Sequence, residues 1–84
     1  MEENLKYLRE KAKNLEPILR IGKFGLSNNV YNEVEKLLKK RHLIKIKILN
    51  NCPMEKSEII EKVLQKSKAL LVSEIGNVFS IYRK

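Results

Sequence analysis

The chain lacks the residues that cross-link a protein or anchor it in a membrane. It has a single cysteine, Cys52, so no internal disulfide can form, and this favours a reducing compartment. Its apolar runs, such as residues 69–72, are far shorter than the ~20 residues that a membrane span needs. Glu2 and Glu3 stand where a secretory signal would begin, with no apolar segment behind them, so we expect no signal peptide and a cytoplasmic location.

Residue sets for catalysis and metal binding are scarce as well. His42 is the only histidine, and neither His42 nor Cys52 has a Cys or His partner at metal-ligand spacing. No nucleophile with its base, and no acid–base pair, can be assembled from the sequence. The sequence therefore predicts no enzyme, no metal site, no cofactor and no small-molecule substrate. We interpret His42 and Cys52 as structural residues.

Positive charge, in contrast, is abundant. The chain has 18 Lys and Arg against 10 Asp and Glu, a net charge of +8, and the excess is equal in the halves before and after His42. The charge must therefore be spread over a folded surface. A hydrophobic content of 43% is too high for a disordered chain, and 84 residues allow one domain, residues 1–84. Basic single domains commonly bind nucleic acid, and less often anionic membranes or acidic proteins.

The first quarter of the chain predicts an amphipathic helix and a short strand. Apolar residues recur there at steps of three and four: Leu5, Leu8, Ala12 and Leu15. Basic residues share another stripe of the same helix: Lys6, Arg9 and Lys13. Pro17 is expected to end the helix, because the residue before a proline is steered toward extended geometry. Residues 18–21 form a β-branched-rich run that predicts a mostly buried strand ending at Gly22.

The middle of the chain predicts a second helix and the clearest strand. Ser27 is a suitable N-cap for a helix that ends near the basic cluster 39–41, where cations are favourable at a helix C-terminus. Residues 43–49 alternate, so that three isoleucines point one way and Lys45 and Lys47 the other. These two lysines either extend a basic surface or simply form the solvated face of the strand.

The last third predicts a third helix and a hairpin. Pro53 suits the first position of a helix whose buried stripe is Ile59, Ile60, Val63 and Leu64. Residues 69–75 and 78–82 predict two antiparallel strands around the two-residue turn Gly76-Asn77. Beyond them, Tyr82 and Arg83 either stack on RNA or pack at the end of the chain.

The element order is therefore α-β-α-β-α-β-β. We expect an α/β (α+β) domain with three helices and a mixed four-stranded sheet. The first two strands should be parallel, joined by a right-handed helical crossover.

The sharpest local motif is the loop Gly22-Lys23-Phe24-Gly25. Two glycines let the backbone turn tightly, and the loop precedes a helix N-terminus, where amides and the helix dipole favour an anion. Lys23 would add a cation, and Phe24 could stack on a base. The alternative is that the glycines serve only the turn and Phe24 fills the core. The loop is not a P-loop, because its glycine spacing differs and Leu26 follows the second glycine.

A longer arrangement resembles a known family. Its residues are Lys6, Leu8, Arg9, Ala12, Leu15, Pro17, Ile21-Gly22-Lys23-Phe24-Gly25-Leu26-Ser27, Leu43-Ile44-Lys45-Ile46-Lys47, Ile75-Gly76 and Ile81-Tyr82-Arg83. They are similar to the CRM domain, named for chloroplast RNA splicing and ribosome maturation, and to its stand-alone bacterial and archaeal YhbY-like members. The resemblance covers about residues 5–83, and the spacing from the first helix through Pro17 to the glycine loop is its most specific part.

The resemblance implies an RNA-binding module with the fold of the C-terminal domain of bacterial translation initiation factor three. Stand-alone members of the family are associated with large ribosomal subunit precursors, and plant members assist group II intron splicing. Carried over by position, the RNA-contacting residues are Gly22, Lys23, Phe24, Gly25, Lys6, Arg9 and Lys13. Glu16 stands where the family often has a basic residue, so we expect an anion near the loop.

The leading hypothesis is a non-catalytic RNA-binding protein, acting as a monomer on ribosomal RNA of large-subunit precursors. Its candidate site adds Arg20, Lys45 and Lys47 to the loop and the first-helix stripe. The alternative from another class is a structural, chromatin-type DNA-binding protein, because small basic domains also coat duplex DNA. Preference for structured RNA over duplex DNA of equal length separates the two.

Overall fold

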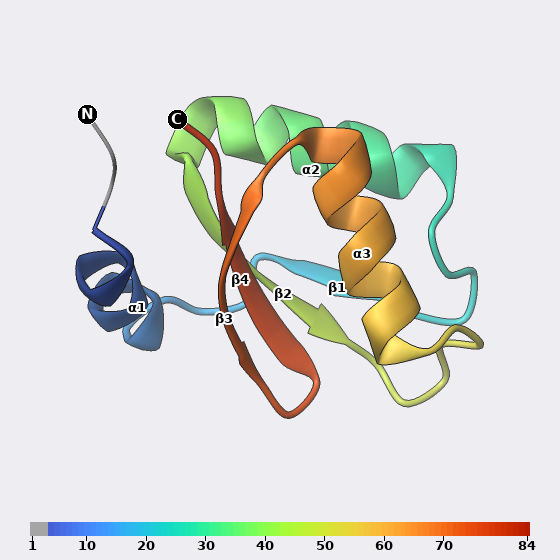
Figure 1. Cartoon of the computed structure of the whole chain (residues 1–84). Coiled ribbons are helices and arrows are strands. Elements are labelled where there is room, and N and C mark those ends of the chain that lie inside the picture. Colours follow the sequence, from blue (N-terminus) through green and yellow to red (C-terminus); the bar gives the residue numbers. More distant parts are fainter. Residues whose placement is uncertain (1–3) are drawn as a thin grey trace.

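The computed structural model describes residues 4–84, so the interpretation of Glu2 and Glu3 lies outside the described residues. The elements follow the expected order (Figure 1). They are α1 (Leu5–Lys13), β1 (Leu19–Ile21), α2 (Asn28–Arg41), β2 (Leu43–Ile48), α3 (Lys56–Ser67), β3 (Leu70–Ile75) and β4 (Val78–Tyr82).

The four strands form one mixed sheet in the order β1-β2-β4-β3. β1 and β2 are parallel, with α2 as their crossover, whereas β4 is antiparallel to both β2 and β3. Gly76 takes a φ of +59° in the hairpin turn, a conformation that glycine adopts without steric cost. The predicted mixed sheet of four strands with three helices is confirmed.

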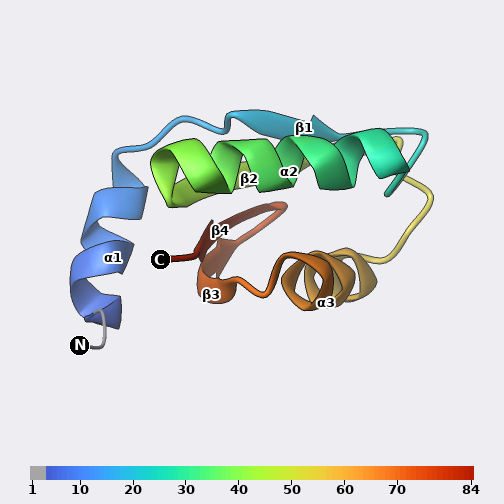
Figure 2. The same ribbon diagram turned by 90° about the horizontal axis from the view of Figure 1, so that it is seen from above.

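The main core lies between one face of this sheet and the helices α2 and α3 (Figures 1 and 2). The three isoleucines of β2 are buried in it, next to Phe79 and Ile81 of β4. The helices contribute their apolar stripes, among them Val34, Leu38, Ile59 and Val63. Because side chains alternate along a strand, burial of this face directs Lys45 and Lys47 to the opposite face.

α1 packs on that opposite face and covers only part of it. Leu8 and Ala12 of α1 are buried against Val72 of β3, with Leu43 and Tyr82 beside them. The helix begins at Leu5 because the side chain of Asn4 accepts a hydrogen bond from the Lys6 amide, at 2.9 Å. The apolar stripe of α1 therefore packs against the sheet, and the basic stripe is exposed to solvent.

β3 contains an irregularity that the alternation of the sequence did not predict. The pairing with β4 shifts between Leu71 and Ser73, so that Ser73 lies opposite Ser80 where Val72 would lie in a regular ladder. Such a bulge brings two consecutive residues to the same face of the sheet. Val72 is thereby available to pack under α1, and Ser73 faces the part of the sheet that α1 leaves open.

Two helix boundaries differ from the sequence prediction. α1 ends at Lys13, before Pro17, because the Asn14 amide bonds to the carbonyls of Lys11 and Ala12 and closes the last turn. α3 begins at Lys56 and not at Pro53, and its N-cap Glu55 makes no side-chain capping bond.

Pro53 instead lies in the loop before α3. Its neighbour Met54 is drawn against Gly25, where a Cβ would lie 3.1 Å from the Met54 sulfur. Met54 thus packs on the glycine loop, in the segment where the sequence predicted the first turn of the helix.

The end of the chain is tied to α2 and α3 by Arg83. Its guanidinium donates to both carboxylate oxygens of Glu35, at 2.8 and 2.9 Å, and to the Ser67 carbonyl at 2.9 Å. For Arg83, terminal packing is thus the alternative that the structure supports. The hydrogen bonds from Arg83 hold the pKa of the Glu35 carboxyl below its ordinary value.

The Glu35–Arg83 pair predicts a pH-dependent contribution to stability. Because the pKa of Glu35 is lowered in the folded state, this contribution is present above the ordinary carboxyl pKa of 4.5 and is lost as the pH falls through the lowered pKa. Glu35→Gln should therefore unfold at a slightly lower temperature than the parent at pH 7, and the difference should vanish in acid. Thermal unfolding followed by circular dichroism from pH 7 to pH 2 measures this. Glu33→Gln, on the same helix, is the control, and equal curves for the two variants would contradict the assignment.

Candidate nucleic-acid interface

The glycine loop presents both of its central side chains to solvent. The Gly25 amide donates to the Gly22 carbonyl at 2.9 Å, which closes a tight turn around Lys23 and Phe24. Phe24 is 82% exposed, so the expectation that it fills the core is wrong. The Lys23 ammonium lies 5.2 Å from the centre of the Phe24 ring. The loop therefore offers a cation and an aromatic face at one point of the surface.

Both glycines also have a role in the fold, which is stricter at Gly25 than at Gly22. Gly25 has a φ of +62°, which side chains other than glycine adopt at a cost. A Cβ on Gly22 would lie 3.3 Å from Asn51 Oδ1 and from the nearest side-chain carbon of Leu49. The turn thus packs closely on the segment after β2. Each interpretation is therefore supported in part, because the glycines build the turn while Lys23 and Phe24, outside the core, are free for a ligand.

The loop leads into α2 as the sequence predicted. Ser27 is the N-cap, and its hydroxyl accepts a hydrogen bond from the Val30 amide at 3.4 Å. The partial positive charge of a helix N-terminus therefore lies three residues from the loop. This partial charge would further stabilise an anion bound by Lys23.

The basic stripe of α1 is exposed, and one of its members is fixed. Arg9 Nε donates to the Val72 carbonyl at 3.1 Å, and this carbonyl belongs to the bulged residue of β3. Lys13 forms a surface ion pair with Glu10 at 3.3 Å, an interaction that is worth little in water. Lys6 is exposed at the start of the helix. The stripe can therefore contact phosphates without breaking a strong interaction within the protein. Its Arg9 is held in place by the hydrogen bond to β3.

The strand residues of the predicted site lie on the open face of the sheet. The register places Arg20 beside Lys47, and Lys47 beside Val78. In the next row, Lys45 lies beside Ser80, which itself lies beside Ser73. The open face therefore carries the cations on β1 and β2, and apolar and hydroxyl side chains on β4 and β3.

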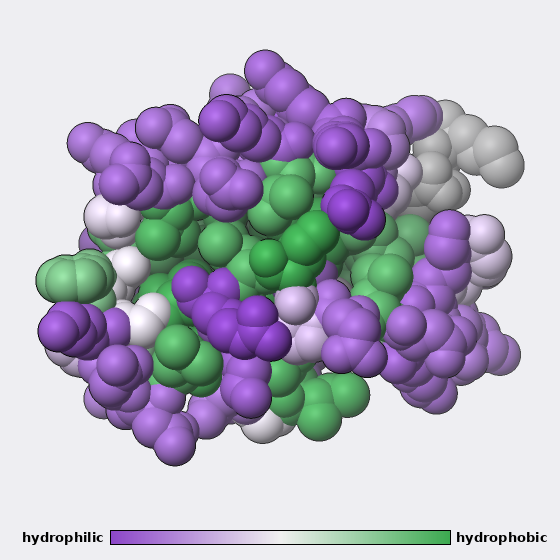
Figure 3. All heavy atoms as spheres, turned by 180° about the vertical axis from the view of Figure 1, so that it is seen from behind, coloured by the Kyte–Doolittle hydropathy of each residue, from purple (hydrophilic) through white to green (hydrophobic). Residues whose placement is uncertain are grey.

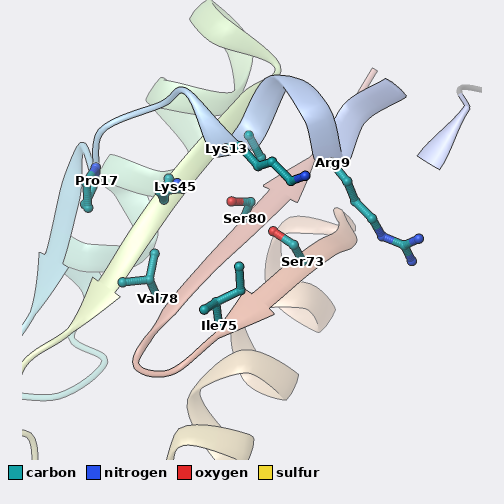
Figure 4. A pocket seen from close by; sticks show the side chains of 9 residues that line it. Arg9, Lys13, Pro17, Lys45, Ser73, Ile75, Val78 and Ser80 are labelled. Carbon is teal, nitrogen blue, oxygen red and sulfur yellow. The ribbon is translucent and has the colours of Figure 1, made fainter. Parts of the chain in front are cut away.

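A hollow of about 410 Å³ lies where this face meets α1. Its lining comes from α1, the segment before β1, and three strands: Arg9, Ala12, Lys13, Pro17, Lys45, Ser73, Ile75, Val78 and Ser80 (Figure 4). Three of these residues, the cations, belong to the site predicted from the sequence. The two serines were not predicted, because their position depends on the bulge in β3 and on the docking of α1.

The structure separates the predicted site into two groups. α1 lies at one end of the molecule and the glycine loop at the other, in both views of the ribbon (Figures 1 and 2). Arg20 and Lys47, on neighbouring strands, lie between them. Glu16, expected near the loop, lies in the segment between α1 and β1 and lines a second, smaller depression together with Lys11 and Arg41. The expectation of an anion near the loop is therefore wrong, because β1 carries the chain away from Glu16 before the loop begins.

The surface seen from behind Figure 1 combines both kinds of side chain. Hydrophilic residues cover the borders formed by α2 and α1, and apolar surface is exposed between them (Figure 3). Within residues 4–84, no helix is long and apolar enough to cross a membrane. The same residues hold no group of three His, Cys, Asp or Glu side chains that could bind a metal ion.

Glycine substitutions at two turns should separate backbone strain from packing. Gly25→Ala should lower the free energy of unfolding by at least about 1–2 kcal/mol, the cost of a left-handed residue with a side chain, with an additional loss from the contact with Met54. Gly76→Ala is the matched control, because its φ is +59° and nothing lies within 4 Å of the added carbon. Urea denaturation measures both. Equal losses would show that Met54 adjusts freely.

The family model for the CRS1 / YhbY (CRM) domain matches residues 1–83. A Bacillus subtilis protein named "Probable RNA-binding protein YqeI" is 35% identical over 79 residues, which cover 94% of this chain and 82% of that protein.

Two further relatives agree with this match. One, named an RNA-binding protein, is from Haemophilus influenzae; it is 32% identical over 92% of this chain and 78% of its own length. The solution structure of a Staphylococcus aureus protein, described as a candidate RNA-binding protein, superposes with a TM-score of 0.79 at 36% identity, covering 95% of this chain and 83% of the other. With the fold, the glycine loop and the whole-length match in agreement, the chain belongs to the CRS1/YhbY (CRM) domain family.

Proposed function

We propose that this protein is a non-catalytic RNA-binding protein that binds ribosomal RNA of large-subunit precursors during ribosome assembly. The observation that carries the proposal is the exposed pair Lys23 and Phe24, held out on a rigid glycine turn at the N-terminus of α2. Similar proteins that are named for RNA binding support it. The net charge of +8 adds the long-range attraction that a polyanion requires.

The arrangement favours a mechanism of positioning without chemistry. Lys23 and the start of α2 would hold a phosphate, while Phe24 would stack on a base or sugar beside it. At the other end of the molecule, Lys6, Arg9 and Lys13 would contact phosphates of the same RNA. Because the molecule is 36 Å in its longest dimension, one RNA segment that contacts both ends would be held in a fixed shape. The protein would work as a monomer in the cytoplasm and stabilise a folded state of its RNA.

The electrostatic part of this mechanism predicts a salt dependence. For a pool of 20-nucleotide single-stranded RNAs, log K should fall linearly with log salt with a slope of about −0.7 per phosphate contact, and we expect about three to six contacts. Replacing Lys6, Arg9 and Lys13 together by Gln should make the slope shallower by about two. Fluorescence anisotropy at several salt concentrations measures this, with thermal unfolding on the same samples, because Arg9→Gln also removes the bond to Val72.

The matched control for this variant removes the same charge elsewhere. Lys36, Lys40 and Lys62 are exposed on α2 and α3 and lie outside the proposed site. Their triple Gln variant should lose less affinity and keep the slope of the parent. Equal losses in both triple variants would show that only net charge matters. Tighter binding to duplex DNA of equal length than to structured RNA would favour the chromatin-type function instead.

The ribosomal assignment is tested in the cells from which the protein comes. Ultraviolet crosslinking followed by sequencing of the bound RNA should recover ribosomal RNA of the large subunit, enriched in unprocessed precursors. Phe24→Ala should reduce the recovered fraction several-fold, because stacking on one base is worth about 1–3 kcal/mol. Tyr7→Ala, an exposed aromatic on α1, is the control for nonspecific loss. Recovery of mainly messenger or transfer RNA would contradict the ribosomal part of the proposal and leave RNA binding intact.

A further inference from the structure

The hollow between α1 and the open face of the sheet combines three kinds of surface. Its walls are apolar, from Ala12, Pro17, Ile75 and Val78. Its volume of about 410 Å³ falls in the range of small-molecule sites. Ile75 is 73% exposed, so its side chain is accessible to a ligand. This geometry suits one flat, partly apolar group.

The bottom of the hollow is polar. Ser80 is fully buried on β4, and its hydroxyl has no hydrogen-bond partner among residues 4–84. Ser73 lies directly opposite Ser80 across the strand pair, and both side chains lie inside the ring of lining residues (Figure 4). A buried hydroxyl without a partner destabilises the protein unless something donates to it or accepts from it. The hydroxyl pair therefore marks a place where a ligand's polar edge would be bound.

The rim of the hollow is cationic. Lys13 and the stem of Arg9 line it on the side of α1, and Lys45 lines it on the side of β2. The Arg9 guanidinium points outward from the hollow (Figure 4), and its Nε bond to the Val72 carbonyl fixes this direction. Anionic groups would thus be held at the edge, while an uncharged group enters between them.

We propose that this hollow binds one unstacked base of an RNA. The base would lie against Ile75, Val78 and Pro17, and its polar edge would bond to the hydroxyls of Ser73 and Ser80. The phosphates on either side would contact Arg9, Lys13 and Lys45. An RNA base fits the three surfaces together, because single-stranded bases are bound by apolar packing of the ring, hydrogen bonds to its edge and cations on its phosphates. The inference rests on the proposed RNA binding and adds a second recognition point, far from the glycine loop.

Small-molecule probes can distinguish binding of the base from binding of the phosphate. Adenosine, cytidine, guanosine and uridine monophosphates are titrated into the protein labelled at its methyl groups, with ribose 5-phosphate as the probe that lacks a base. We expect at least one nucleotide to shift the NMR signals of Ile75, Val78 and Ala12, and ribose 5-phosphate to leave them in place. If no nucleotide and no 12-nucleotide oligo(A), oligo(C) or oligo(U) moves these methyl signals, the inference is overturned.

Two variants test the hollow in RNA binding without a change of charge. Ser73→Phe fills it with a side chain that strands accept well, and the affinity for the 12-nucleotide RNAs should fall roughly tenfold, the loss of one stacked base. Because no phosphate contact is removed, the salt slope should stay that of the parent. Ser80→Ala removes the buried hydroxyl alone and should weaken binding several-fold while the melting temperature is kept or raised. Ser57→Phe, on the exposed side of α3, is the matched control.

The outcomes distinguish this inference from the proposed function. If the parent protein binds none of the RNAs, RNA binding and the base site both fail. If the parent binds RNA and Ser73→Phe binds it equally well while folded, only the base site fails. An affinity loss accompanied by a shallower salt slope would also overturn it, because Ser73 would then be acting on phosphate contacts. If a protein side chain is the natural occupant, the methyl signals stay in place with every RNA.

Discussion

Burial of one face of β2 is the constraint on which the rest of the structure depends. Ile44, Ile46 and Ile48 are nearly inaccessible to solvent, and they join the stripes of α2 and α3 to the centre of the sheet. Since the side chains of a strand alternate, this burial commits Lys45 and Lys47 to the opposite face. β2 also pairs on both sides, with β1 and with β4, so it sets the register of Arg20 and Ser80. The core therefore determines where the positive charge of the sheet lies.

The opposite face is partly covered by α1, which is held there by a second, smaller hydrophobic cluster. Leu8 and Ala12 anchor α1 on Val72, and the bulge at Val72 makes this contact compatible with the main ladder. The same bulge turns Ser73 toward Ser80 and frees the carbonyl that fixes Arg9. One irregular residue thus positions the first-helix cations, the hydroxyl pair and the hollow between them. At the other end, Met54 packs closely on Gly25 of the glycine loop.

The proposed interface follows from these two constraints. The rigid sheet holds two groups of RNA-binding candidates at a fixed separation, with Arg20 and Lys47 between them. A flexible basic tail would attract RNA equally well but could not impose a shape on it. Contacts at both ends of one face would give the protein a preference for RNA folds that present phosphates at the matching distance.

The sequence by itself determined the order of the elements, the mixed sheet and the buried stripes, whereas the exposure of Phe24 was left open. The first three follow from local rules, namely the helical and strand periods, the Ser27 cap and the turn at Gly76. Only the tertiary structure decided the early end of α1, the late start of α3, the bulge at Val72 and the separation of the loop from the first helix. These depend on which surfaces pack together over long sequence distances, as Met54 does with Gly25, and such contacts leave no period in the chain. The hollow belongs to the second group, because its lining meets only when α1 docks on a sheet whose third strand is bulged.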